Sequence, residues 1–235
     1  STEGNESEAS STANSVSIVS RNWAPTMLEC PNLEGAIGAL LGAPDSTLRL
    51  IAMLLIARLA RDAGSHPRFI EVCLPRVCRA LQGTRDAALV AQACEALVFI
   101  AGQPENLMLL TEGAGQDAVH VVINLLPKWS SKEGEEWMRV LSFALQTLNH
   151  VSYSAREFVD RGGGTDAVLC VLRESQDKEV LRWAIAVLRS MVLLQQAAER
   201  MRDPEAGCLT ASAKVLLHVE DLHVQASAGR LLHLL

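Results

Sequence analysis

A polar cluster near the middle of the chain is the group of residues best suited to chemistry. It contains Asn149, His150, Ser152, Tyr153 and Ser154, and a histidine beside a hydroxyl group can act as the base that activates a nucleophile. No oxyanion donors or supporting acid can be identified beside it. We therefore expect these side chains to satisfy carbonyl groups at a helix end and to start the next helix.

Two other patterns that could bind phosphate or metal are incomplete. Gly162-Gly163-Gly164 lacks the Lys-Ser/Thr of a P-loop and follows a predicted helix rather than a strand, which indicates a turn between helices. The histidines form no His-Glu-x-x-His pair; they are His66, His120, His150, His218, His223 and His233. We predict that the protein is not an enzyme and has no cofactor or metal site.

The cysteines are scattered through predicted helices without a Cys-x-x-Cys pair. They are Cys30, Cys73, Cys78, Cys94, Cys170 and Cys208. Their even number would allow three disulfides, but helical solenoids of the cytosol or nucleus commonly bury single thiols. We therefore expect free thiols and a cytoplasmic or nuclear location.

The composition favours a protein that binds other proteins over one that binds nucleic acid. Hydrophobic residues make up 49% of the chain and aromatic residues only 4%, so Leu, Ala and Val must fill the core. A net charge of −6 counts against contact with phosphate backbones. We find no apolar run long enough to span a membrane and no secretory signal at the N-terminus.

A recurring helix organises the chain. Its apolar anchor residues stand at intervals of 41, 48, 43 and 43 residues, at Ile56, Leu97, Leu145, Leu188 and Leu231. Four positions before them stand Ala52, Ala93, Leu141, Ala184 and Ser227, and three positions after them stand Leu59, Ile100, Leu148, Met191 and Leu234. Such a period is typical of stacked helical repeats. We predict an all-α, right-handed solenoid of about five units, at 32–64, 65–102, 103–152, 153–193 and 194–235.

Residues 1–31 are expected to form a polar tail or linker, because their first part is rich in Ser, Thr, Asn and Glu. Within it, Val16-Ser17-Ile18-Val19 resembles a SUMO-interaction motif that could add a strand to a partner's sheet. The chain begins without Met and stops at Leu235 within a helical pattern. We expect it to be part of a larger protein, or to associate with itself or another chain through its uncapped ends.

The third and fourth units resemble the armadillo repeat family. The resemblance rests on 105–113 followed by 118–126, and on 158–162 followed by 166–172, which look like the first and second helices of the family. It implies that the third helices line a concave face. In peptide-binding members a row of Asn and a row of Trp lie there. Here the Asn row is replaced by Arg58, Phe99, Thr147, Ser190 and His233, and the Trp row by Leu54, Glu95, Phe143, Ala186 and Gly229.

We therefore predict a partner-binding groove that differs from the importin-like one. The groove is apolar at Leu54, Phe99 and Phe143 and basic at Arg58, Arg139 and Arg182, with Glu95 and Thr147 in the same rows. It would suit an amphipathic helix or an acidic, hydrophobic peptide. The alternative is that the phenylalanines pack into neighbouring units and the arginines are solvated.

Two further features could contact a partner. Trp129 lies in the polar segment 127–134, where it either folds back on the helices or waits for a partner. Seven arginines between Asp45 and Asp86 could recognise an acidic or phosphorylated segment; they are Arg49, Arg58, Arg61, Arg68, Arg76, Arg79 and Arg85.

The sequence thus predicts a non-catalytic scaffold that binds a partner peptide or helix on the concave face of the solenoid. The alternative function is a regulatory module, similar to armadillo-type chaperone cofactors, that clasps a folded domain. A nucleic-acid-binding array would need a continuous basic stripe, which the acidic later units do not provide.

Overall fold

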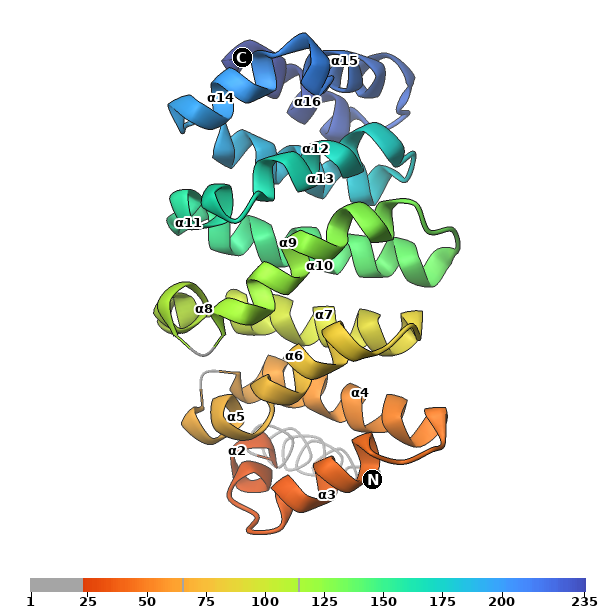
Figure 1. Cartoon of the computed structure of the whole chain (residues 1–235), viewed down its shortest axis with the longest axis vertical. Coiled ribbons are helices and arrows are strands. Elements are labelled where there is room, and N and C mark those ends of the chain that lie inside the picture. Colours follow the sequence, from red (N-terminus) through yellow and green to blue (C-terminus); the bar gives the residue numbers. More distant parts are fainter. Residues whose placement is uncertain (1–22, 65, 114) are drawn as a thin grey trace, which may run out of the picture.

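The computed structural model describes residues 23–64, 66–113 and 115–235, and these fold into helices and turns with no strand among them. The helices form five consecutive units stacked along the long axis of the molecule (Figure 1). Each unit has a short first helix, a second helix and a long third helix. The predicted docking segment Val16–Val19 lies outside the described residues.

The bounds of the helices repeat with the unit. The first helices are α2 (Trp23–Leu28), α5 (Pro67–Val72), η1 (Pro104–Asn106) with α8 (Leu107–Glu112), α11 (Arg156–Arg161) and α14 (Gln195–Arg202). The second helices are α3 (Leu33–Leu41), α6 (Leu74–Gly83), α9 (Gln116–Ser130), α12 (Gly164–Glu174) and α15 (Cys208–His218), with η2 (Pro204–Ala206) before the last. The third helices are α4 (Ser46–Ala63), α7 (Ala87–Ala101), α10 (Glu135–Ser154), α13 (Lys178–Met191) and α16 (Leu222–Leu234).

The core of the solenoid lies where the predicted anchors meet. Ile56, Leu97, Leu145, Leu188 and Leu231 are all 0% exposed, and each third helix packs against the next one along the stack. At the last unit the pattern opens to solvent, since Leu234 is 44% exposed. The predicted all-α solenoid is therefore confirmed, with the anchors at its centre.

The third helices start in a recurring way. In the described part of the chain, aspartates precede α4, α7, α13 and α16, and each accepts a hydrogen bond from a backbone N–H of the first turn. These caps satisfy donors that the helix itself leaves free; they are Asp45, Asp86, Asp177 and Asp221. Before α10 stands Gly134 instead, with φ 108°.

The first unit is more complete than the sequence predicts. Helix α2 lies within the segment assigned to the tail, where Ala24 and Leu28 are buried. The indole Nε1 of Trp23 donates a hydrogen bond to Asp62 Oδ2 on α4, at 3.1 Å. Since Ala24 and Leu28 lie four residues apart, they share one helix face, and this face docks a short first helix on the unit.

Other helix ends differ from the predictions for local reasons. Pro75 stands in the first turn of α6, which starts at Leu74 just after α5 ends at Val72; at this position a proline removes no hydrogen bond within the helix. Helix α9 continues through Pro127 to Ser130, beyond the predicted end at Leu126. Among the described residues no single helix is long and apolar enough to cross a membrane. Within the same described ranges, the segments Ala87–Ala101 and Pro104–Glu112 reach that length and composition together, but they are bent by 101° at the break between them.

Candidate peptide-binding surface on the third helices

Most of the predicted groove residues lie at the surface of consecutive third helices. Leu54 is 46% exposed, and the side chains of Arg58, Arg139 and Arg182 are 53%, 42% and 49% exposed. Glu95, Phe99 and Phe143 are half-buried. We call the set formed by these exposed and half-buried residues of α4, α7, α10 and α13 the third-helix surface.

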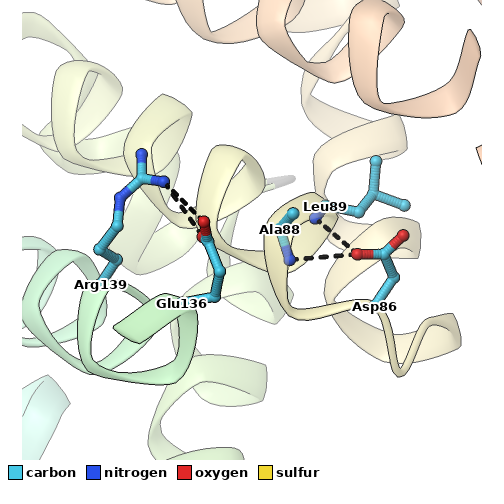
Figure 2. Close-up of polar contacts among 5 residues, drawn as sticks. All are labelled: Asp86, Ala88, Leu89, Glu136 and Arg139. Atoms are coloured by element: carbon cyan, nitrogen blue, oxygen red, sulfur yellow. Dashed lines mark hydrogen bonds and ion pairs between the residues drawn. The ribbon is translucent and has the colours of Figure 1, made fainter. Parts of the chain in front are cut away.

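A polar bridge joins α7 to α10 on this surface. With its amide group oriented so that both ends are paired, Gln92 donates to Glu95 Oε2 at 2.9 Å and accepts from Arg139 Nη2 at 3.3 Å. Arg139 Nη1 also donates to both carboxylate oxygens of Glu136, at 3.0 and 3.3 Å. Figure 2 shows this pair on α10 beside the capped start of α7. The bridge fixes the guanidinium and offsets its charge.

Arg139 also contacts an aromatic ring, and α13 repeats the arrangement. The Arg139 guanidinium lies 5.9 Å from the centre of the Phe143 ring. On α13, Arg182 Nη2 pairs with Glu179 Oε1 at 3.2 Å, and its guanidinium lies 4.9 Å from the centre of the Trp183 ring. Both glutamate–arginine pairs stand at the same distance in sequence from their anchors. Because the arginines are paired and only half exposed, each offers a positioned cation rather than a free one.

At the α4 end the third-helix surface is apolar. Ile51 is 51% exposed and lies three residues before Leu54, so the two share a helix face. Arg58 and Arg61 follow on the same helix, and both pair with Asp62, at 3.2 and 3.3 Å. This single carboxylate pairs with both arginines and offsets one of their two positive charges. The apolar contacts on α4 come from Ile51 and Leu54.

Sequence reasoning missed Ile51, Gln92 and Trp183. Ile51 could have been found from its spacing to Leu54. Trp183 stands next to Arg182, and its half-buried ring carries an Nε1 that has no hydrogen-bond partner among the described residues. The role of Gln92 depends on contacts across two helices, so no local pattern indicates it.

Two predicted partner-binding residues are buried. Thr147 is 0% exposed, and its Oγ1 donates to the carbonyl of Phe143 at 3.0 Å. Trp129 is 5% exposed and lies on α9, with its ring centre 6.5 Å from that of Trp137. The folded-back alternative is therefore the correct one for Trp129, and neither side chain presents a contact surface to a partner.

The polar cluster at the end of α10 is built into the helix. Ser152 is buried; its Oγ donates to the carbonyl of Asn149 at 3.2 Å, and its carbonyl accepts from Ser190 at 2.9 Å. Partial burial lowers the pKa of His150, but no hydrogen bond joins this ring to a hydroxyl among the described residues. The prediction that the cluster starts the next helix is wrong, because α10 continues to Ser154 and α11 begins after Ala155 without a side-chain cap.

The glycine run, the cysteines and the possible metal ligands were the other groups considered for chemistry. Gly163 adopts φ 81° in the turn before α12, which confirms the predicted inter-helix turn. All six cysteine thiols are free, and burial raises the pKa of Cys73 to about 12, with Arg76 opposing the shift. In the described ranges no three His, Cys, Asp or Glu side chains lie close enough together to hold a metal ion.

Stacked three-helix units with their third helices on one surface define the chain as an α-solenoid. Its fold is that of armadillo repeat proteins, as comparison with solved structures shows. A designed armadillo repeat protein in complex with the peptide (KR)4 has a TM-score of 0.70 and 18% identity, covering 98% of this chain and 95% of that one. Computationally designed armadillo repeat proteins for modular peptide recognition give a TM-score of 0.67 and 17% identity, with coverage of 94% and 93%. No protein-family model and no curated protein sequence matches the chain.

Proposed function

We propose that this chain is a non-catalytic scaffold that binds a partner segment along its third-helix surface. The observation that carries the proposal is the continuity of this surface. Exposed Ile51 and Leu54 on α4 lead to half-buried Phe99 on α7 and then to arginines stacked on aromatic rings of α10 and α13. Such a surface offers apolar contacts at one end and oriented donors at the other.

The chemistry of the surface favours an amphipathic, acidic segment. Apolar side chains of the partner would cover Ile51 and Leu54, where burial contributes about 25 cal/mol per Å². Partner carboxylates would accept from the guanidinium groups of Arg139 and Arg182, whose positions are already fixed by glutamates. Because the stacked helices are preformed, little conformational entropy is lost in the protein on binding.

The designed relative solved with (KR)4 suggests a direct comparison of partners. Peptide-binding members of the armadillo family, which this chain resembles, carry a row of Asn and a row of Trp on the third helices. This chain has neither row. We therefore propose that it prefers an acidic amphipathic peptide over (KR)4.

Fluorescence anisotropy with two labelled peptides tests this proposal. One probe is (KR)4 and the other a helical peptide with Leu on one face and Glu on the other. We expect saturable binding of the second probe and at least a tenfold loss for Ile51→Ser/Leu54→Ser. The matched control is Leu193→Ser, since Leu193 is 61% exposed but lies after α13. Tighter binding of (KR)4, or equal loss in the control, would contradict the proposal.

A clasp around a folded domain is the second candidate function, and an apolar edge supports it. Met108 on α8 is 71% exposed, Tyr153 at the end of α10 is 77% exposed, and Leu193 is also exposed. They lie near the junctions between third and first helices. If this edge binds a partner, short peptides will not compete with the folded domain, and Tyr153→Ser will weaken the complex while Leu54→Ser will not.

A further inference from the structure

A cleft at the edge of the first two units gathers three arginines. It has a volume of about 390 Å³ and lies where α3 leads into α4 and α6 leads into α7. These two connections are on the right-hand side of Figure 1. Arg49 comes from the first turns of α4, and Arg76 and Arg79 come from α6. The remaining lining is apolar or small and consists of Gly38, Leu41, Gly42, Ala80, Gly83, Thr84 and Leu89. None of the described residues that line the cleft is acidic.

One of the three arginines is held in place by the protein. The side chain of Arg76 is 17% exposed, and its Nη2 pairs with Glu34 Oε1 and the carbonyl of Glu34, at 3.3 and 3.4 Å. Its Nη1 donates to the carbonyl of Val72. A Cβ atom at Gly38 would lie 3.6 Å from Arg76 Nη2, an ordinary van der Waals contact, so this guanidinium lies directly against α3.

The other two arginines have no partner in the described part of the chain. Neither Arg49 nor Arg79 forms an ion pair or hydrogen bond there, and the Nε atom of Arg49 is buried and unpaired. By contrast, Arg58 and Arg61 of the same basic region both pair with Asp62, and Arg76 pairs with Glu34. Arg49 and Arg79 are therefore the two cleft arginines without a carboxylate partner in the described part of the chain.

Two aspartates close in sequence are committed to other contacts. Asp45 accepts from the backbone N–H of Thr47 at 2.7 Å. Asp86 accepts from Ala88 and Leu89 at 3.1 and 3.3 Å, as Figure 2 shows. The positive charge of the cleft is therefore available to an anion from outside. A buried donor without a partner and two uncompensated guanidinium groups both favour a ligand with several acceptor oxygens.

We propose that this cleft is a binding site for the phosphate group of a phosphorylated serine or threonine in a partner protein. A phosphate dianion has three acceptor oxygens and a charge of about −1.5 to −2 at pH 7. It would offset the charges of Arg49 and Arg79, beside which Arg76 is already paired with Glu34. Leu41, Ala80 and Leu89 line the same cleft and provide apolar contact for the residues that flank the phosphate. The site is separate from the third-helix surface and does not depend on the function proposed for it.

Nuclear magnetic resonance of the arginine Nε–Hε groups tests the site with defined probes. The probes are N-acetyl-O-phosphoserine methylamide, the unphosphorylated serine compound and inorganic phosphate, all at constant ionic strength and pH 7.5. We expect a saturable shift of the Arg49 resonance with the phosphoserine compound and none with its serine counterpart. Arg49→Gln and Arg79→Gln should each weaken phosphoserine binding at least fivefold, measured on the remaining cleft arginines.

A matched variant and the two phosphate sources make each outcome decisive. Arg230→Gln removes the same charge from an exposed arginine on α16 and should leave phosphoserine binding unchanged. Equal weakening in this control, or the absence of any shift at Arg49, would overturn the site. Inorganic phosphate that binds as tightly as phosphoserine would overturn the assignment to a phosphorylated protein. Circular dichroism checks that every variant stays folded, which we expect because removing one of three like charges relieves repulsion.

Discussion

The third helices of the first two units and those of the next two present different surfaces on the same scaffold. On α4, exposed Ile51 and Leu54 make the surface apolar. On α10 and α13, glutamate–arginine pairs with an adjacent aromatic ring occupy the corresponding region. Beneath both surfaces the anchors are equally buried. The comparison shows that the repeat fixes the core, while the exposed positions of each unit are free to carry different chemistry.

Trp129→Ala should have the largest effect on stability and would sharpen the contrast between core and surface. Trp129 is almost fully buried beside Trp137, and removing a buried Trp side chain costs about 3–5 kcal/mol. Urea unfolding followed by circular dichroism measures the loss. The control is Tyr153→Ala, whose side chain is largely exposed and should cost about 0.5 kcal/mol or less. Equal losses would mean that Trp129 does not pack as described.

Leu97→Ala and Leu188→Ala test whether the two regions share one core. Both anchors are 0% exposed, so each substitution should reduce the free energy of unfolding by about 2–5 kcal/mol. The losses should be similar for the two variants. Urea titration measures both losses. If the free energy of unfolding fell only slightly for one of the two variants, the two anchors would not contribute equally to the core.

Gly164→Ala and Gly35→Ala should have opposite signs. A Cβ atom at Gly164 would lie 2.4 Å from Val159 Cγ1 and 2.7 Å from the Val159 carbonyl oxygen, whereas one at Gly35 would meet nothing within 4 Å. Overpacking costs about 1–3 kcal/mol, and replacing a glycine inside a helix by alanine gains about 0.5–1 kcal/mol. Thermal unfolding should show a lower Tm for the first variant and a higher Tm for the second. A raised Tm for Gly164→Ala would contradict the crowding described for the α11–α12 turn.

Arg182→Gln should have the smallest effect, which depends on salt. Its ion pair with Glu179 is about half exposed, and such pairs contribute about 0.2–1 kcal/mol. We expect the destabilisation to shrink as NaCl rises from about 0.05 to 1 M, because salt screens exposed charges. Leu54→Ser on α4 lacks a charge partner, so its effect should not change in this way. A salt-independent loss for Arg182→Gln would mean that the side chain acts through packing.

The repeat and its core could be predicted from the sequence because they depend on local spacing. The anchors and the glycine turn at 161–164 both follow from patterns within one unit. The surface could be predicted only in part. Thr147 has the same offset from its anchor as exposed Arg58, yet it is buried, since the packing of neighbouring units decides which way each position faces.

Contacts between residues far apart in the sequence also explain the other misses. Helix α2 is short and is held by Trp23 on Asp62, far along the chain. Gln92 joins Glu95 and Arg139 across two helices. The arginine cleft draws its residues from several helices of two units, so the sequence indicated a basic region but not which arginines lack a partner.

The aspartate caps have a consequence for how the protein could be rebuilt. Asp177 and Asp221 cap α13 and α16 in the same way, and α13 packs against the third helices on either side of it, α10 and α16. A segment that runs from Asp177 to the residue before Asp221 therefore begins at the start of one third helix and ends at the start of the next. A chain lengthened by a copy of that segment would keep the order of first, second and third helices along the stack. Duplication from cap to cap is therefore a natural way to engineer longer versions of this molecule.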